Sequence, residues 1–66
     1  MSFSEAFNYI LLNVCDIERV ANDDYLYEVD MTYAIGRWVT LTEEQVIEFA
    51  EKCASGIDAK IAIKEV

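Results

Sequence analysis

The stretch Tyr25–Leu41, YLYEVDMTYAIGRWVTL, decides the fold that we expect for this chain. From Tyr25 to Tyr33, residues of one set, mostly aromatic or apolar, alternate with a mostly polar set, which is the pattern of a half-buried β-strand. Gly36 is the one glycine of the stretch, and glycine readily supplies the positive φ that ends a tight hairpin loop. We therefore predict a β-hairpin with a three-residue loop, Ala34–Gly36.

The length of this loop sets which residues of the two strands face each other. A three-residue loop places Met31 opposite Val39 and Val29 opposite Leu41, so both strands present one apolar face on the same side. A two-residue loop would turn Val39 and Leu41 to the opposite side. The three-residue loop is therefore the one that gives the hairpin a consistent inner face.

A capping box marks the start of a first helix before the hairpin. Ser2 is followed three residues later by Glu5, so each side chain can bond to the backbone N–H of the other. Apolar residues then recur at helical spacing, which predicts one buried stripe. We expect this helix to reach Ala21, with Asn22–Asp24 as the turn into the hairpin.

A second capping box, formed by Thr42 and Gln45, predicts a second helix directly after the hairpin. This helix should end near Ala54, because Gly56 follows at the position where a left-handed residue commonly terminates a helix. The remaining segment, Ile57–Glu65, alternates isoleucine and alanine with mostly polar residues. That period of two predicts a last strand.

The expected order is α-β-β-α-β in a single domain over residues 1–66. Each element has one apolar side, which predicts a two-layer α+β fold: a three-stranded, mainly antiparallel sheet with two helices on one face. We expect the strand over Tyr25–Tyr33 to lie in the centre, flanked by the second hairpin strand and the last strand. A core of this size is marginal, so a bound partner or a homodimer is a reasonable expectation.

Thirteen acids stand against five bases, there is no histidine, and the net charge is −8. This charge argues against direct binding of nucleic acid or of an anionic membrane. No apolar run approaches the length of a membrane span, and no basic segment precedes the first apolar stretch, so we expect a cytoplasmic protein. Cys15 and Cys53 are expected to be reduced, buried thiols, and two cysteines without histidine are too few for a usual zinc site.

The sequence contains no pattern typical of catalysis. It has no histidine, no serine or cysteine beside a plausible base, and no glycine-rich phosphate loop, so we expect neither enzymatic activity nor a cofactor. Asp23 and Asp24, together with Glu28 and Asp30, supply oxygen ligands of the kind that hard cations prefer. Their spacing matches no calcium-binding loop, so we expect no metal site.

The acids themselves are concentrated in one part of the chain. The fifteen residues from Asp16 to Asp30 contain six acids and a single base, Arg19. On the expected first helix, Asp16 and Glu18 would lie near the C-terminal end, where the helix dipole disfavours negative charge. Folding therefore does not account for this concentration, and a binding role is the alternative explanation.

The outer face of the hairpin adds a second observation. Glu28 and Asp30 share this face with Trp38, and carboxylates around an exposed tryptophan suit a basic, partly apolar partner surface. Trp38 could instead simply pack across the strands on Thr32. The residues that we predict to bind a partner are Asp16, Glu18, Asp23, Asp24, Glu28, Asp30 and Trp38.

In its charge of −8 over 66 residues and in this acidic cluster, the chain resembles a class of small acidic phage proteins. These are the anti-restriction and anti-CRISPR proteins that disarm host defence, some of them as DNA mimics. The resemblance implies a non-enzymatic inhibitor that occupies the basic channel of a host DNA-binding protein or nuclease complex and blocks DNA binding. The alternative is a small homodimeric protein-interaction subunit that uses the exposed apolar residues Tyr9, Leu12 and Trp38.

Overall fold

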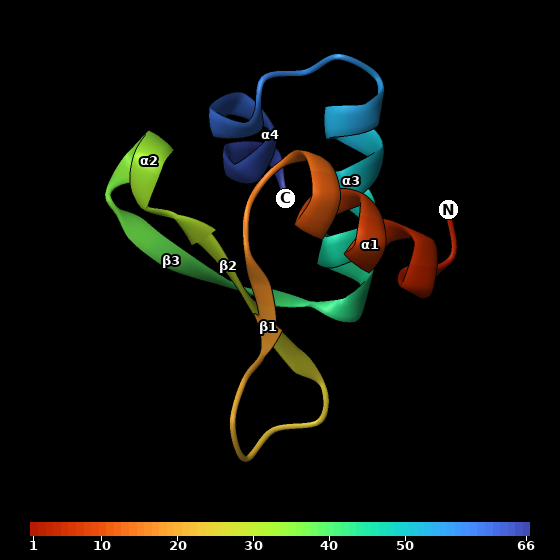
Figure 1. Ribbon diagram of the computed structural model, residues 1–66, viewed down its shortest axis with the longest axis vertical. Helices are drawn as coiled ribbons and strands as arrows, with labels where there is room; N and C mark the ends of the chain where they lie inside the picture. Colours follow the sequence, from red (N-terminus) through yellow and green to blue (C-terminus); the bar gives the residue numbers. More distant parts are fainter.

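The computed structural model describes all 66 residues. Its elements, in chain order, are α1 (Phe3–Asn13), β1 (Ile17–Arg19), β2 (Leu26–Met31), α2 (Thr32–Ile35), β3 (Arg37–Thr42), α3 (Glu43–Ala54) and α4 (Ala59–Glu65). The strands form one antiparallel sheet in the order β1-β2-β3, and α1 and α3 lie together on one side of it (Figure 1). The predicted α+β class with a three-stranded antiparallel sheet is confirmed, although the helices number four and not two.

The central hairpin is confirmed, but its connection is longer than predicted. Val29 pairs with Val39 and Met31 with Arg37, so five residues and not three join the strands. Four of them coil into the single turn of α2, and Gly36 ends that turn with the predicted positive φ, at 79°. The predicted and observed connections differ by two residues, an even number, so the same residues of each strand still face the helices.

The first helix ends at Asn13, so the prediction that it reaches Ala21 is wrong. Residues 17–19 instead form β1, which pairs with β2 and completes the sheet. The apolar residues Val14, Ile17 and Val20 are spaced as on a helix, but all three are β-branched and fit a strand equally well. No basic residue offsets the dipole in the last turn of α1, so a longer helix had little local support.

The predicted last strand over Ile57–Glu65 is also wrong, because this segment forms α4. The side chain of Asp58 accepts a hydrogen bond from the Lys60 N–H and caps the helix. Ala62 and Ile63 are buried while Ile61 is exposed, which is the burial pattern of a helix and not of a strand. The third strand of the sheet is therefore β1, and β2 keeps its predicted place in the centre.

One hydrophobic cluster of 12 buried residues lies between the sheet and the helices. It takes residues from α1 (Ala6, Ile10), the sheet (Ile17, Tyr27, Val29, Met31, Leu41), α3 (Val46, Phe49, Ala50) and α4 (Ala62, Ile63). Both predicted capping boxes are present, which fixes where α1 and α3 begin. The ring of Phe3 packs on that of Tyr27 with 4.8 Å between centroids, and this contact seats α1 on the sheet. The helices thus cover one face of the sheet and leave the other open.

Candidate functional site

The open face of the sheet carries most of the predicted partner-binding residues. Successive side chains of a strand point to opposite faces, so the neighbours of the buried Ile17, Val29 and Leu41 point outward. The paired residues form rows across the strands: Asp16 beside Asp30 beside Trp38, and Glu18 beside Glu28 beside Thr40. Asp16 directly precedes β1, and its carbonyl accepts a hydrogen bond from the Asp30 N–H at 2.9 Å. Four carboxylates therefore occupy neighbouring positions on one face of the sheet.

Glu18 and Glu28 are paired directly across β1 and β2. Residues paired in this way have Cβ atoms about 4.5–5.5 Å apart, and like charges at that separation destabilise the sheet. Neither carboxylate makes an ion pair or a side-chain hydrogen bond. Folding alone does not favour this pair of charges.

No base lies on the open face to compensate the carboxylates. By alternation along their strands, Arg19 and Arg37 project from the other side of the sheet. The three lysines, Lys52, Lys60 and Lys64, belong to α3 and α4 in the helical layer. The charged side chains of the open face are therefore all acidic, whereas the helical layer carries charges of both signs.

Two of the six predicted acids have clear structural roles. Asp30 accepts hydrogen bonds from the hydroxyl of Thr32 at 2.5 Å and from its N–H at 3.0 Å, which supports the turn of α2. These two bonds lower the pKa of Asp30 from its ordinary value, the hydroxyl contributing most. Asp23 accepts a hydrogen bond from the Tyr25 N–H at 2.8 Å, as in an Asx-turn. Both positions require an acceptor oxygen and not a negative charge.

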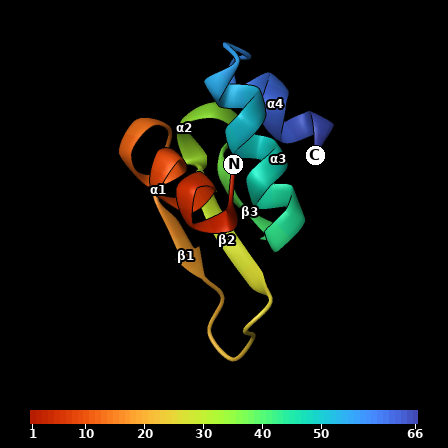
Figure 2. The ribbon, with the colours of Figure 1, turned by 90° about the vertical axis from the view of Figure 1, so that its right-hand side faces the viewer.

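The loop between β1 and β2 contains the remaining acid, Asp24. This loop reaches away from the helices in both views of the ribbon (Figures 1 and 2). The carboxylate of Asp24 lies 3.7 Å from the guanidinium of Arg19, and both side chains are mostly exposed. An exposed ion pair of this kind contributes little to stability, so Asp24 remains available to a partner.

Trp38 lies on the open face opposite Asp30, and 39% of its surface is exposed. Trp38 does not pair with Thr32 across the strands, because its partner in the register is Asp30 and Thr32 belongs to α2. Trp38 therefore forms an apolar border to the carboxylates. The structure therefore brings Glu28, Asp30 and Trp38 to one face, whereas Asp23 and Asp24 lie in the loop between β1 and β2.

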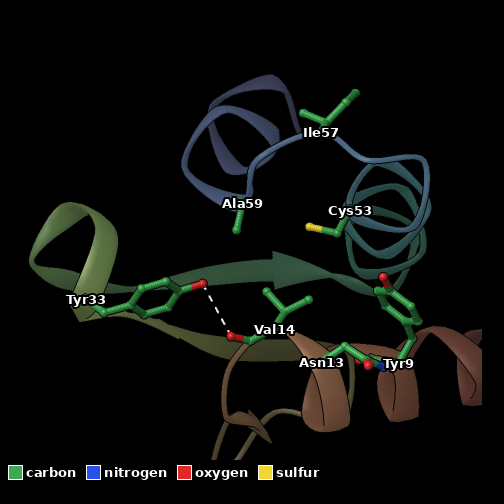
Figure 3. A pocket seen from close by; sticks show the side chains of 7 residues that line it. All are labelled: Tyr9, Asn13, Val14, Tyr33, Cys53, Ile57 and Ala59. Atoms are coloured by element: carbon green, nitrogen blue, oxygen red, sulfur yellow. Dashed lines mark hydrogen bonds between the residues drawn. The ribbon is translucent and has the colours of Figure 1, made fainter.

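A pocket of about 320 Å³ lies on the opposite side of the molecule, between the ends of the helices (Figure 3). Its walls are mainly apolar: Tyr9, Asn13, Val14, Tyr33, Cys53, Ile57 and Ala59. The hydroxyl of Tyr33 donates a hydrogen bond to the Val14 carbonyl at 3.3 Å, which ties α2 to the end of α1. The sulfur of Cys53 points toward Ala59 across the pocket (Figure 3).

The two thiols are unpaired, as predicted, but they are half-buried and not fully buried. Desolvation is the main cause that raises the pKa of Cys15 to about 11, and it also raises the pKa of Cys53. Both thiols are therefore protonated at neutral pH, and a protonated thiol is a poor nucleophile. The lining of the pocket holds no carboxylate, imidazole or amine to activate Cys53.

No group of three or more histidine, cysteine or acidic side chains has an arrangement that would hold a metal ion. None of the helices combines the length and the apolar character that crossing a membrane requires.

The fold and the surface together define a small α+β domain with one open, acidic sheet face. Comparison with known protein families, with curated protein sequences and with solved structures finds no match for this chain. The functional interpretation therefore depends on the residues of the open face themselves.

The sequence predicts the position of Glu28, Asp30 and Trp38 on the open face of the sheet, but its prediction for Asp16 and Glu18 is wrong. Asp16 and Glu18 lie beyond the end of α1, so the argument from an adverse helix dipole does not apply to them. They lie instead on the open face, where Glu18 meets Glu28. The signal that could have placed them was the β-branched character of the apolar residues around them.

Proposed function

We propose that this protein is a non-enzymatic inhibitor that docks its open acidic face on the basic, nucleic-acid-binding surface of a partner protein. The carboxylates of the open face stand in for the phosphates of DNA and keep DNA from that surface. One observation carries this proposal: Glu18 and Glu28 are paired across strands on a face without a base. A pair that opposes folding is explained when a partner supplies the missing positive charge.

Nuclease complexes of host defence, which are the targets of anti-CRISPR and anti-restriction proteins, have the basic channel that this proposal requires. Such a channel is lined with lysine and arginine, and its attraction for an acidic surface decreases as salt increases. Trp38 at the border of the carboxylates would add an apolar contact, a role in which tryptophan is enriched at interfaces. The chain itself is not expected to bind DNA, because both are strongly negative.

The alternative function, a protein-interaction subunit that uses Tyr9, Leu12 and Trp38 together, has less support. Tyr9 lines the pocket between the helix ends, whereas Leu12 lies on α1 with 79% of its surface exposed. Trp38 lies on the open face, which the helices do not cover. The three residues therefore do not form one continuous contact surface.

A competition experiment tests the proposed function. The immobilised protein is incubated at low salt with a lysate of the organism that carries its gene, and bound proteins are eluted with duplex DNA. We expect DNA to release basic DNA-binding proteins, and we expect the purified protein to show no affinity for the same duplex. Tight binding of the protein to DNA, or elution that DNA does not promote, would contradict the proposal.

A triple variant ties this result to the open face. Asp16→Asn, Glu18→Gln and Glu28→Gln remove three charges that make no ion pair within the domain. The control, Glu44→Gln, Glu48→Gln and Glu65→Gln, is matched in the number of charges removed; it takes them from the helical layer, where Glu48 and Glu65 pair with Lys52. We expect the open-face variant to lose the DNA-releasable partners and the control to retain them.

A further inference from the structure

The outer edge of β3 has backbone groups without partners. The hydrogen bond from the Asp30 N–H to the Asp16 carbonyl shows that the even-numbered residues of β2 bond to β1. The odd-numbered residues of β2 therefore bond to β3, through the pairs that Val29 and Tyr27 form with Val39 and Leu41. It follows that Trp38 and Thr40 direct both their N–H and their C=O groups away from the sheet.

One neighbouring contact supports this assignment and marks where the free edge ends. Thr42 follows Thr40 in the same alternation, and its outward N–H is bonded to the side chain of Gln45 at 2.9 Å. No side chain bonds to the backbone of Trp38 or Thr40, and both residues are exposed. The free edge therefore consists of two donors and two acceptors on either side of Val39.

An exposed edge of this kind is a template for another strand, and proteins usually protect it with proline, lysine or a bulge. Here the edge strand is RWVTLT, six residues long, without proline or lysine. It is twice as long as β1 at the opposite edge, which has three residues. The β3 edge is thus the better site for adding a strand.

We propose that this edge pairs with β3 of a second copy of the same chain, antiparallel and centred on Val39. In this register Trp38 of each copy lies opposite Thr40 of the other copy, and all four N–H and all four C=O groups find partners. The set of free groups is symmetric about Val39, so it is self-complementary under a two-fold axis. The result is a six-stranded sheet in which both open faces point the same way.

The distribution of charge favours a second copy as the occupant. The twelve residues from Met31 to Thr42 contain no acid and one arginine, although the chain carries a net charge of −8. The acids of the open face lie on β1 and β2, so edge-to-edge pairing through β3 keeps the acidic stripes of the two copies apart. This is the edge of the sheet at which two copies of so acidic a chain can approach each other with little repulsion.

The side chains of the proposed pair are also compatible. In an antiparallel pair, residues on the diagonal of one face are within reach of aromatic side chains. The two copies of Trp38 become diagonal neighbours on the open face, and the two copies of Val39 meet on the inner face. The added contact supplements a core of only 12 buried residues. The inference does not depend on the identity of the partner that the acidic face binds.

The mass of the purified protein in solution tests the pairing. The contact is small, so we expect the mass in sedimentation experiments to rise from one chain of 7.6 kDa toward two chains between about 10 µM and about 1 mM. The single tryptophan, Trp38, reports on the same equilibrium through a blue shift of its fluorescence as the concentration rises. A mass of one chain across the whole range would overturn the proposal, including the case in which the edge binds a strand of another protein.

A pair of proline variants locates the contact. Thr40→Pro removes an outward N–H and leaves the bonds between β2 and β3 intact, so the protein is expected to keep its circular dichroism spectrum and to stay monomeric. Arg19→Pro is the matched control, because the Arg19 N–H points outward at the opposite edge of the sheet. We expect this control to dimerise like the wild type. A folded Thr40→Pro variant that still dimerises would contradict pairing through β3.

Amide hydrogen exchange tests the pairing without any substitution, in case the proline variant fails to fold. We expect exchange at the Trp38 and Thr40 amides to slow as the protein concentration rises, while exchange at the Arg19 amide stays constant. Exchange at Trp38 and Thr40 that does not vary with concentration would overturn the proposal.

Discussion

Two consecutive segments that build the sheet differ sharply in charge. The segment from Asp16 to Asp30 carries six acids and one base, whereas the segment from Met31 to Thr42 carries no acid. The first segment builds β1, the projecting loop and β2, and the second builds α2 and β3. The comparison shows that, within the sheet, the negative charge is concentrated on the first segment, while the other seven of the thirteen acids lie on or beside the helices.

The comparison also separates two kinds of acid within the first segment. Asp23 and Asp30 accept hydrogen bonds from nearby backbone N–H groups, so local folding explains them. Glu18 and Glu28 have no such partner and oppose each other across the strands. Counting acids in a sequence does not make this distinction, but the hydrogen bonds and the register do.

The largest effect is expected from removing the unpartnered charges of the acidic segment, which should weaken binding of the basic partner. We expect the triple variant at Asp16, Glu18 and Glu28 to bind the basic partner about tenfold to a hundredfold more weakly, because each exposed charge contributes up to about 1 kcal/mol. Affinity measured at several salt concentrations should also depend less on salt than that of the wild type. Equal loss in the helical-layer control, or a salt dependence that stays the same, would show that net charge alone matters.

In the acid-free segment, the stability of the fold should be most sensitive to substitution at Gly36. Its φ of 79° disfavours other residues, and a Cβ built there would contact nothing within 4 Å, so the cost of substitution is conformational. We expect Gly36→Val to lower the free energy of unfolding by about 1–2 kcal/mol. The melting temperature should fall by roughly 4 °C or more in a domain of this size. Gly36→Asn is the control, because asparagine tolerates this conformation, and its melting temperature should fall less.

Asp30 should behave as part of the fold and not only as part of the binding surface. We expect Asp30→Ala to lower the melting temperature, because the bonds from Thr32 are lost, while Asp30→Asn should keep most of the stability. Because the pKa of Asp30 is lowered in the folded protein, its contribution to stability depends on pH. Its contribution is present above the ordinary carboxyl pKa and is lost as the pH falls through the folded pKa. Melting curves at neutral and acidic pH should therefore show that the difference between the wild type and Asp30→Asn disappears in acid.

The smallest effect on stability is expected from removing the repulsion between Glu18 and Glu28. Glu28→Gln should raise the free energy of unfolding by roughly 0.2–0.5 kcal/mol, because a like-charge cross-strand pair is removed. Added salt should narrow the difference between this variant and the wild type, since salt screens the repulsion. Denaturant unfolding at low and high salt provides the measurement. A variant that is less stable than the wild type at low salt would show that Glu28 supports the fold.

The parts of the fold that sequence predicts well are those with one dominant local signal. Both capping boxes and the positive φ of Gly36 follow from residue types whose bonds or backbone preferences have few alternatives. The central strand follows from an alternation that no helix would bury. The ends of this strand were not predicted correctly, since Tyr25 and Tyr33 lie outside β2 and are exposed.

The segments that sequence misassigned have patterns that satisfy two structures at once. Ile57, Ala59, Ile61 and Ile63 alternate like a strand, yet Ala59, Ala62, Ile63 and Val66 are spaced like one face of a helix. Packing against α3 decides between these patterns, and packing is not visible in the sequence. The same limit applies to the site. Glu18 lies on the open face because β1 pairs with β2, and the β-branched residues around it fit a helix as well as a strand, so the local pattern alone does not decide.

The five-residue connection between β2 and β3 governs how this hairpin can change its length. An insertion or deletion of two residues within Thr32–Gly36 keeps the inner and outer faces of both strands as they are. A change of one residue would turn Trp38 inward and Leu41 outward, which would place a core residue in solvent. Natural or engineered length variants of this turn should therefore come in even steps, while odd steps should require a compensating bulge in one strand.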